Sequence, residues 1–266
     1  GLVDYTEDFG AVNNNHILQK YPEIFLAGIK QPLFRTPLYY ELSGTYDYLH
    51  RGEGDQGHFA DVTPSVSLPY NIFNYLKVTP QFALKETFWS RDDNNEDDDS
   101  QKKTDDRILY NASISLSSQL SRVFNVQMKN WEKIRHEIKP EIIYSYIPDV
   151  SSDNVPDYYS PVSSFFIQPI PTLSGDTLME QNAVAWSLTN TLTTRVKDDT
   201  GSYSYLSFLR LRLFQTYDIH ESRRGMDKHD PERRPWSDMG IEFDFSPHKY
   251  FSLRARDRYN VYSGWK

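Results

Sequence analysis

The chain has 266 residues, a formal net charge of −8 and no cysteine, and it is rich in tyrosine (19) and phenylalanine (15). No apolar run approaches the roughly 18 residues that a membrane-spanning helix requires, which excludes a helical membrane protein. The acidic balance argues against a nucleic-acid partner, because nucleic-acid phosphates are met by clustered Lys and Arg. Without cysteine, neither a disulfide framework nor a thiolate metal site can form.

Apolar and polar residues alternate with period two through most of the chain. In the segment LSFLRLRLFQTY, for example, the leucines alternate with Arg210 and Arg212. This period indicates strands rather than helices. Most of the segments reach the roughly 9 to 11 residues that a tilted strand needs to cross a bilayer. Strands are predicted at about ten places: residues 23–30, 36–49, 57–68, 75–90, 107–120, 135–147, 182–197, 204–218, 236–246 and 249–263.

The connections between the predicted strands alternate in length. From the second strand onward, long polar loops such as RGEGDQG and HESRRGMDKHDPERRP alternate with shorter links such as PYNIFN and SPHKY. Long loops on one rim and short turns on the other are typical of a bacterial outer-membrane barrel. Aromatic residues near the predicted strand ends suit the girdles at the membrane interfaces of such a barrel: Tyr48, Phe88, Trp89, Tyr144, Tyr146, Tyr217, Trp236 and Tyr262.

The sequence therefore predicts an all-β fold, an antiparallel transmembrane β-barrel of the bacterial outer membrane, with about ten strands of a larger barrel in this chain. A soluble antiparallel sandwich also alternates apolar and polar residues, but the strand lengths and the asymmetry of the loops disfavour it. The polar phase is expected to line a wet lumen with these charged residues: Glu41, Asp47, Asp61, Lys77, Lys85, Glu137, Lys139, Arg210, Arg212, Glu242, Asp244, Arg254, Arg256 and Arg258.

Proline interrupts three of the predicted strands. Pro64, Pro80 and Pro140 lie on the apolar phase, and each lacks the N–H that a strand interior uses for pairing. An unpaired carbonyl has no hydrogen-bond partner in lipid. We therefore expect a bulge or a lumen-side water opposite each proline.

Several segments resemble, in the same order, those of the LptD family of outer-membrane lipopolysaccharide-assembly proteins. The segment RHEIKPEIIYSYIPDV is similar to the family's His-x-x-x-Pro-x-x-x-Tyr-x-Tyr-x-Pro strand. YPEIFLAG looks like the family's Leu-Pro-Glu-Ile entry, with Tyr21 in place of the leucine, and VTPSVSLPY, NAVAWSLTNTLTTRV, FLRLRLFQTYDIHESRR and RPWSDMGIEFDFSP follow in order. The resemblance runs from about Tyr21 to Trp265. In the first of these segments it rests on His136, Pro140, Tyr144, Tyr146 and Pro148.

The resemblance implies lipopolysaccharide transport and insertion into the outer leaflet of the cell outer membrane of a Gram-negative bacterium. The implied partners are lipopolysaccharide, outer-membrane lipids, an LptE-like plug lipoprotein inside the barrel and an LptA-like periplasmic bridge protein. Neither catalytic residues, nor a cofactor, nor a metal is implied. The bridge protein would bind the family's periplasmic jelly-roll domain, which is absent from this chain, and the disulfides of some members cannot form without cysteine.

The resemblance also assigns the parts of the chain. We expect residues 1–20 to be an N-terminal segment, with a stretch missing near residues 10–20. Residues 21–266 are expected to be a middle portion of the family's C-terminal barrel.

The arginines of the last predicted strands are the candidate ligand-binding residues. Guanidinium groups bind phosphate in bidentate fashion, so a cationic strip in the lumen could contact lipopolysaccharide phosphates or the plug. The alternative is that these arginines only pair with Glu242 and Asp244 across the lumen. The candidates are Arg210, Arg212, Arg254, Arg256 and Arg258, with Lys77 and Lys85 as further lumenal cations.

Three other hypotheses remain from the residues. The acidic segment from Asp92 to Asp106 could hold divalent cations between lipopolysaccharide headgroups, or it could be a solvated loop. A general porin or transporter would also have an amphipathic barrel. An outer-membrane hydrolase would need a base beside a nucleophile, and the candidate bases near long loops are His50, His58, His220 and His229.

Overall fold

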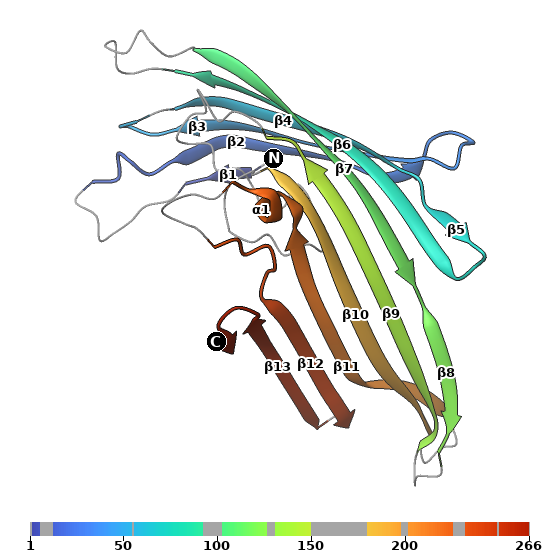
Figure 1. Cartoon of the computed structure of the whole chain (residues 1–266). Helices are drawn as coiled ribbons and strands as arrows, with labels where there is room; N and C mark the ends of the chain where they lie inside the picture. The colour runs from blue at the N-terminus through green and yellow to red at the C-terminus, as the bar shows by residue number, and fades with distance from the viewer. Residues whose placement is uncertain are drawn as a thin grey trace.

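The computed structural model describes residues 2–5, 13–54, 56–92, 103–126, 131–149, 180–197, 202–225, 232–248 and 250–265. These residues form one antiparallel sheet and one short helix (Figure 1). Within them, no helix is long and apolar enough to cross a membrane.

Neighbours in the sheet are neighbours along the chain. The sheet path is β1 (Leu2–Asp4), β2 (Gln19–Pro32), β3 (Tyr39–His50), β4 (Gly57–Ser67), β6 (Leu76–Arg91), β7 (Thr104–Ser118), β9 (Trp131–Ile147), β10 (Gln181–Lys197), β11 (Tyr203–Asp218), β12 (Met239–His248), β13 (Phe251–Asn260) and β14 (Gly264–Trp265). Two short strands lie off this path: β5 (Tyr70–Ile72) pairs with β6, and β8 (Leu120–Asn125) pairs with β9. The helix α1 (Ile219–Arg223) lies between β11 and β12.

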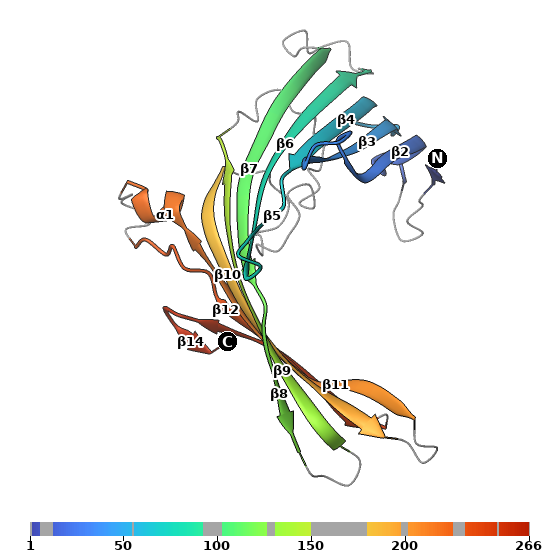
Figure 2. The same cartoon turned by 90° about the vertical axis from the view of Figure 1, so that its right-hand side faces the viewer.

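All ten predicted strands are present, and the predicted fold class is confirmed. They correspond to β2, β3, β4, β6, β7 and β9 to β13. The sheet is strongly curved, and its end strands β1 and β14 are not paired with each other in the described part of the chain (Figure 2). The arrangement is consistent with part of an outer-membrane barrel.

The strands that the sequence missed are short. β1, β5 and β14 have two or three residues each, too few to show a period. β8 continues β7, because Ser117 opposite Glu141 and Leu120 opposite Ile138 keep one register along β9. The two strands are therefore one long strand whose pairing with β9 is interrupted near Gln119.

Connections alternate between the two edges of the sheet, and the three longest share one edge. Residues 51–56, 92–103, 148–180 and 219–238 connect strands at this edge, here called the long-loop rim. Residues 33–38, 68–75, 126–130, 198–202 and 249–250 join strands at the opposite edge, the short-turn rim. The predicted contrast in length holds from residue 92 onward but not at residues 51–56, a connection shorter than residues 68–75. An antiparallel sheet with neighbours in chain order requires the alternation of edges.

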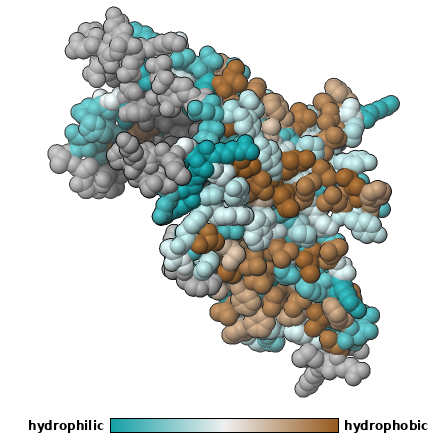
Figure 3. All heavy atoms as spheres, viewed as in Figure 1, coloured by the Kyte–Doolittle hydropathy of each residue, from teal (hydrophilic) through white to brown (hydrophobic). Residues whose placement is uncertain are grey.

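The two faces of the sheet differ in polarity. Cross-strand register places all fourteen charged residues predicted for the lumen on one face. Curvature crowds this concave face, where even Lys85 and Glu137 are buried. The convex face exposes an apolar surface, much of which is visible in Figure 3. Its exposed side chains include Leu26, Val62, Phe82, Ile114, Ile142 and Leu253.

One predicted girdle residue lies on the wrong face. Trp89 is opposite Phe59 in the β4–β6 pair, and both side chains are buried on the concave face. Side chains along a strand alternate between the two faces of the sheet. Trp89 therefore shares the face of Lys85, and its neighbour Phe88 lies on the other face. Highly exposed aromatic rings also mark the short-turn rim, where Phe34, Phe73 and Tyr250 lie in turns. The sequence analysis missed this second group.

Each of the three prolines coincides with a lapse in pairing on one side only. Pairing between β4 and β6 stops after Val62 and resumes at Ser65, which spans Pro64. Ladder pairing along β6 is interrupted between Gln81 and Val78, where the backbone N–H of Leu68 still donates to the carbonyl of Pro80 at 3.0 Å. Pairing along β9 lapses between Glu141 and Ile138. The register is unchanged across each lapse, so the expected bulges are absent. The other neighbour of each proline pairs without a break.

The close approach of β4 to β6 at Gly57 generates a testable prediction. A Cβ atom there would lie 1.8 Å from the backbone oxygen of Ser90, and φ is +150°. We expect Gly57→Ala to destabilise the folded full-length protein by about 1 to 3 kcal/mol, seen as a lower temperature for loss of the folded band on gels. Gly225→Ala is the matched control, since nothing lies within 4 Å of its Cβ position. Equal stability of the two variants would contradict the prediction.

Candidate functional site on the concave face

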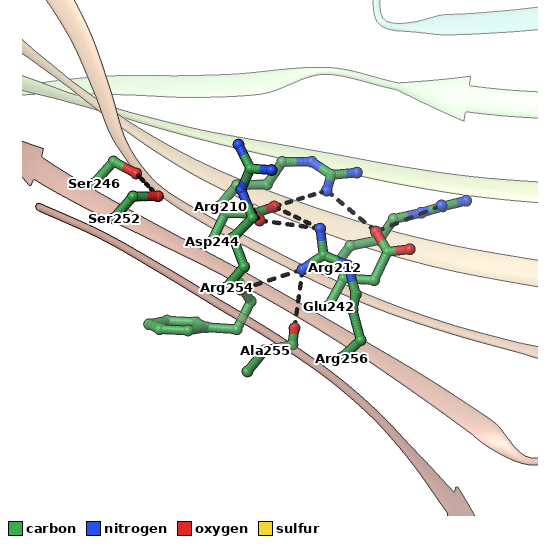
Figure 4. A network of polar contacts seen from close by, with 10 residues as sticks. Arg210, Arg212, Glu242, Asp244, Ser246, Ser252, Arg254, Ala255 and Arg256 are labelled. Carbon is green, nitrogen blue, oxygen red and sulfur yellow. Dashed lines mark hydrogen bonds and ion pairs between the residues drawn. The ribbon is translucent and has the colours of Figure 1, made fainter. Parts of the chain in front are cut away.

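The predicted arginines are brought together by strand register on β11, β12 and β13. Arg210 is opposite Asp244, which is opposite Arg254, and the next row holds Arg212, Glu242 and Arg256. Directly opposite side chains on one face of a sheet lie within interaction distance. Figure 4 shows Arg210, Arg212, Arg254 and Arg256 around the two carboxylates. Arg258, opposite Gly240 on the same face, completes what we call the arginine cluster: Arg210, Arg212, Arg254, Arg256 and Arg258.

Two carboxylates hold most of the arginine cluster. Arg210 Nη1 lies 3.1 Å from Glu242 Oε2 and 3.3 Å from Asp244 Oδ2. Arg256 Nη2 donates to both oxygens of Asp244, at 3.0 and 3.3 Å. Arg212 lies 3.8 Å from Glu242, and Arg254 lies 4.0 Å from Asp244. The cross-strand pairing considered as the alternative is therefore present for four of the five arginines.

Pairing does not neutralise the cluster. Five guanidinium groups face two carboxylates, which leaves three positive charges in excess. The Arg254 side chain is 78% exposed and only at the limit of an ion pair. Arg258, also exposed, makes no ion pair with any described residue. Exposed pairs contribute about 0 to 1 kcal/mol each, so Arg254 and Arg258 can turn to an anionic ligand at little cost.

An aromatic ring that the sequence analysis missed supports one end of the cluster. Phe214 lies on the same phase as Arg210 and Arg212, and the Arg212 guanidinium lies 4.9 Å from its ring centroid. The ring occupies the space over Gly240, where a Cβ atom would come within 2.2 Å of it. Gly240 is opposite both Phe214 and Arg258. The sequence did contain a signal for Phe214: it lies an even number of residues from Arg210 and Arg212 and therefore shares their face of β11.

The two candidate lysines lie elsewhere on the concave face. Lys85 is 4% exposed, and its Nζ lies 3.3 Å from Asp61 Oδ2 on β4. Lys77 lines a groove of about 410 Å³ near the short-turn rim, together with Gln119, Lys139 and Pro140. Strands β7, β9 and β10 separate β6 from β11. The structure therefore does not bring either lysine into the arginine cluster.

Between the lysines and the arginines, hydroxyl side chains cover the concave face. Thr189 and Thr191 on β10 are opposite Arg212 and Arg210. On β9, Glu137 accepts from Gln119 Nε2 at 2.7 Å and pairs with Lys139 Nζ at 3.0 Å. The result is a broad polar surface whose charges are mostly compensated locally, except at the arginine cluster.

The described histidines considered for a hydrolase lie in two places: His50 and His58 are both beside the ring of Tyr48, and His220 is in α1. His58 Nδ1 lies 2.8 Å from Tyr46 Oη, and His220 Nε2 lies 3.4 Å from Glu180. His50 packs near the ring of Tyr48, whereas His229 lies outside the described residues. In the described ranges, no group of three His, Asp or Glu side chains could hold a metal ion. Most of the acidic segment 92–106 also lies outside the described residues.

The connection after β11 forms an ordered polar cap at the long-loop rim. Asp218 caps α1 by accepting from the backbone N–H of Glu221 at 3.0 Å. The Glu221 carboxylate accepts from Arg224 Nε at 2.7 Å and Nη2 at 3.1 Å, and from the backbone N–H of Arg234 at 3.2 Å. The hydrogen bonds from Arg224 hold the pKa of Glu221 below its ordinary value.

Comparison with known proteins identifies a family. The family model LptD, described as LPS transport system D, matches residues 3–264. No curated protein matches the chain.

The hydrogen bonds that the Glu221 carboxylate accepts predict that the stability of the β11–β12 connection depends on pH. Because folding lowers the pKa of Glu221 from 4.5, its contribution to stability is present above that value and is lost as pH falls through the folded pKa. We expect hydrogen-exchange protection of residues 219–224, corrected for intrinsic rates, to fall below about pH 4. Glu221→Gln should show weaker protection already at neutral pH.

Glu232→Gln is the control for this experiment. The Glu232 side chain is 72% exposed and pairs at the surface with Arg234 at 2.9 Å, a contact that contributes little because both groups are solvated. Its loss should leave protection of residues 219–224 unchanged. A loss of protection equal to that of Glu221→Gln would contradict the assignment of this protection to the hydrogen bonds that Glu221 accepts.

Proposed function

The chain belongs to the LptD family, and from this premise we propose that it forms part of the barrel through which lipopolysaccharide is inserted into the outer leaflet of the outer membrane. At the family level the function is lipopolysaccharide transport, and the family is one of outer-membrane proteins. The proposal adds that lipopolysaccharide is delivered into the outer leaflet without a covalent reaction.

The observation that carries the proposal is the opposite polarity of the two faces of one curved sheet. Apolar side chains such as Phe82, Ile142 and Leu253 cover the convex face, which suits contact with acyl chains. The concave face carries an arginine cluster with excess positive charge. Lipopolysaccharide has the same division, with acyl chains on one side and phosphorylated sugars on the other.

The arginine cluster is the proposed contact for anionic groups inside the barrel. Arg254 and Arg258 are the members least committed to carboxylates, so they would bind phosphate first. Arg210 and Arg256 instead hold the three strands in register through Asp244. Lys77 is a second proposed contact, at the groove near the short-turn rim.

We also propose an LptE-like plug lipoprotein inside the barrel. The hydroxyl-rich concave surface, with Thr189, Thr191 and Ser187 on β10, offers donors and acceptors without large side chains. An LptA-like bridge partner is proposed from family membership alone. Membership likewise favours assembly over a general porin or a hydrolase.

Depletion of the full-length protein tests the proposed function. We expect newly made lipopolysaccharide to stop reaching the cell surface, measured by labelling intact cells, while other outer-membrane barrels continue to be inserted. Continued surface delivery after complete depletion would contradict the proposal. Loss of every barrel together would point instead to a general assembly defect.

Variants of the arginine cluster test the proposed contact. We expect Arg254→Gln with Arg258→Gln to lower surface lipopolysaccharide several-fold at an equal amount of folded protein, because each lost phosphate contact weakens binding. Arg35→Gln is the control: its side chain lies in the β2–β3 turn, away from the cluster. Normal delivery by the folded double variant would contradict the proposed phosphate contact.

A further inference from the structure

Charged side chains on the convex face are sorted between its two rims. The register places Glu86, Asp106 and Asp257 on this face, and each lies toward the long-loop rim. Arg122 on β8 lies on the same face near the short-turn rim, three positions before β8 ends at Asn125. Arg122 is thus a cation on the convex face at the rim opposite to these acidic residues, and its position requires an explanation.

Polar side chains from three adjacent strands lie next to one another, with His136 between Arg122 and Asn190. His136 on β9 is directly opposite Arg122, and its Nε2 lies 3.2 Å from Oδ1 of Asn190 on β10. Arg122 makes no ion pair with any residue in the described part of the chain, and its guanidinium lies 5.3 Å from the ring centroid of Phe124. We call Arg122, His136 and Asn190 the convex polar cluster. Hydrophilic side chains interrupt the apolar surface at the β8 end of the sheet (Figure 3).

The cluster offers hydrogen-bond donors and no carboxylate. When His136 donates from Nε2 to Asn190 Oδ1, the Asn190 amide keeps both of its N–H donors. Arg122 adds a guanidinium fork that matches the oxygens of a phosphate. The hydrogen bond between His136 and Asn190 explains those two residues as structural, but among the described residues it leaves Arg122 with the ring of Phe124 and without an anionic partner.

Apolar side chains surround the cluster. Leu120 and Phe124, which flank Arg122 on the same face of β8, are 54% and 43% exposed. Leu192 is opposite His136, and Ile138 is opposite Asn190. A ligand that fits this site would have an anionic group at the convex polar cluster and hydrocarbon on both sides of that group. The site lies near the short-turn rim, at the depth of lipid headgroups.

We propose that the convex polar cluster binds the phosphate of an anionic glycerophospholipid in the membrane leaflet at the short-turn rim. In outer-membrane barrels this rim is periplasmic, so the ligand belongs to the inner leaflet, opposite the leaflet that receives lipopolysaccharide. The inference rests on the membrane placement in the proposed function. It adds a lipid-binding site outside the barrel, separate from the arginine cluster.

Fluorescence quenching by nitroxide-labelled lipids tests the site. A fluorophore attached at Leu120→Cys, in a chain that has no other cysteine, reports which lipid lies beside Arg122. The full-length protein is placed in phosphatidylcholine nanodiscs that contain a small fraction of nitroxide-labelled phosphatidylglycerol or phosphatidylcholine. We expect phosphatidylglycerol to be enriched roughly five-fold at the label, the effect of one arginine on an anionic lipid.

Variants separate the cluster from general attraction by the protein. Arg122→Gln with Asn190→Leu should remove the preference for phosphatidylglycerol, and Arg254→Gln on the concave face should retain it. A folded-band assay on gels checks each variant. An unchanged preference in the folded double variant would overturn the inference.

The remaining outcomes distinguish this inference from the proposed function. Equal quenching by both lipids in the unsubstituted cluster would overturn the lipid site and leave the proposed function standing. Absence of quenching by either lipid would show that the convex face is not in the membrane. The lipid site and the proposed function would then both be wrong. Loss of the preference on adding millimolar inorganic phosphate would identify a site for free phosphate, not for a lipid.

Discussion

Backbone hydrogen bonding between neighbouring strands is the constraint on which the rest of this structure depends. A bilayer contains no water to satisfy an unpaired N–H or carbonyl, so each strand must pair on both sides. Pairing in chain order yields one antiparallel sheet with side chains alternating between two faces. The existence of two distinct faces, and of two rims between which the connections alternate, follows from it, and the residue types on each face then set its polarity.

The prolines show how much departure this constraint tolerates. Pro140 lacks a donor, and pairing lapses beside it on the side of β7 and β8, while pairing with β10 continues through Leu188. The lapse lies next to the groove that Gln119 and Lys139 line on the polar face. Polar side chains are thus available close to the backbone groups left unpaired, and the register survives without a bulge.

Electrostatics differ between the two faces because their surroundings differ. On the concave face, cross-strand neighbours of opposite charge compensate one another, as Asp244 does between Arg210 and Arg256. What remains is a modest cationic excess that is exposed enough to exchange partners. On the convex face, Arg122 has no such neighbour among the described residues. The proposed lipid phosphate would supply an anionic partner from the membrane.

Period-two alternation is a local property, so the sequence by itself determined the strands, the two faces and the alternation of the loops. It also placed Arg210, Arg212, Arg254, Arg256 and Arg258 on the polar phase, because parity along a strand needs no knowledge of neighbours. The short strands β1, β5 and β14 escaped because a few residues show no period. Trp89 was assigned to the wrong face because the prediction relied on its position near a strand end and not on the alternation of side chains along the strand.

Only the tertiary structure decided which residues meet. Cross-strand register joined Arg256 to Asp244 and set Lys85 against Asp61, far from the arginines. It also brought His136 to Asn190, across 54 residues of chain. Register depends on hydrogen bonds between strands that are distant in sequence. A sequence pattern therefore shows which face a side chain is on, and the folded sheet shows which side chains are its neighbours.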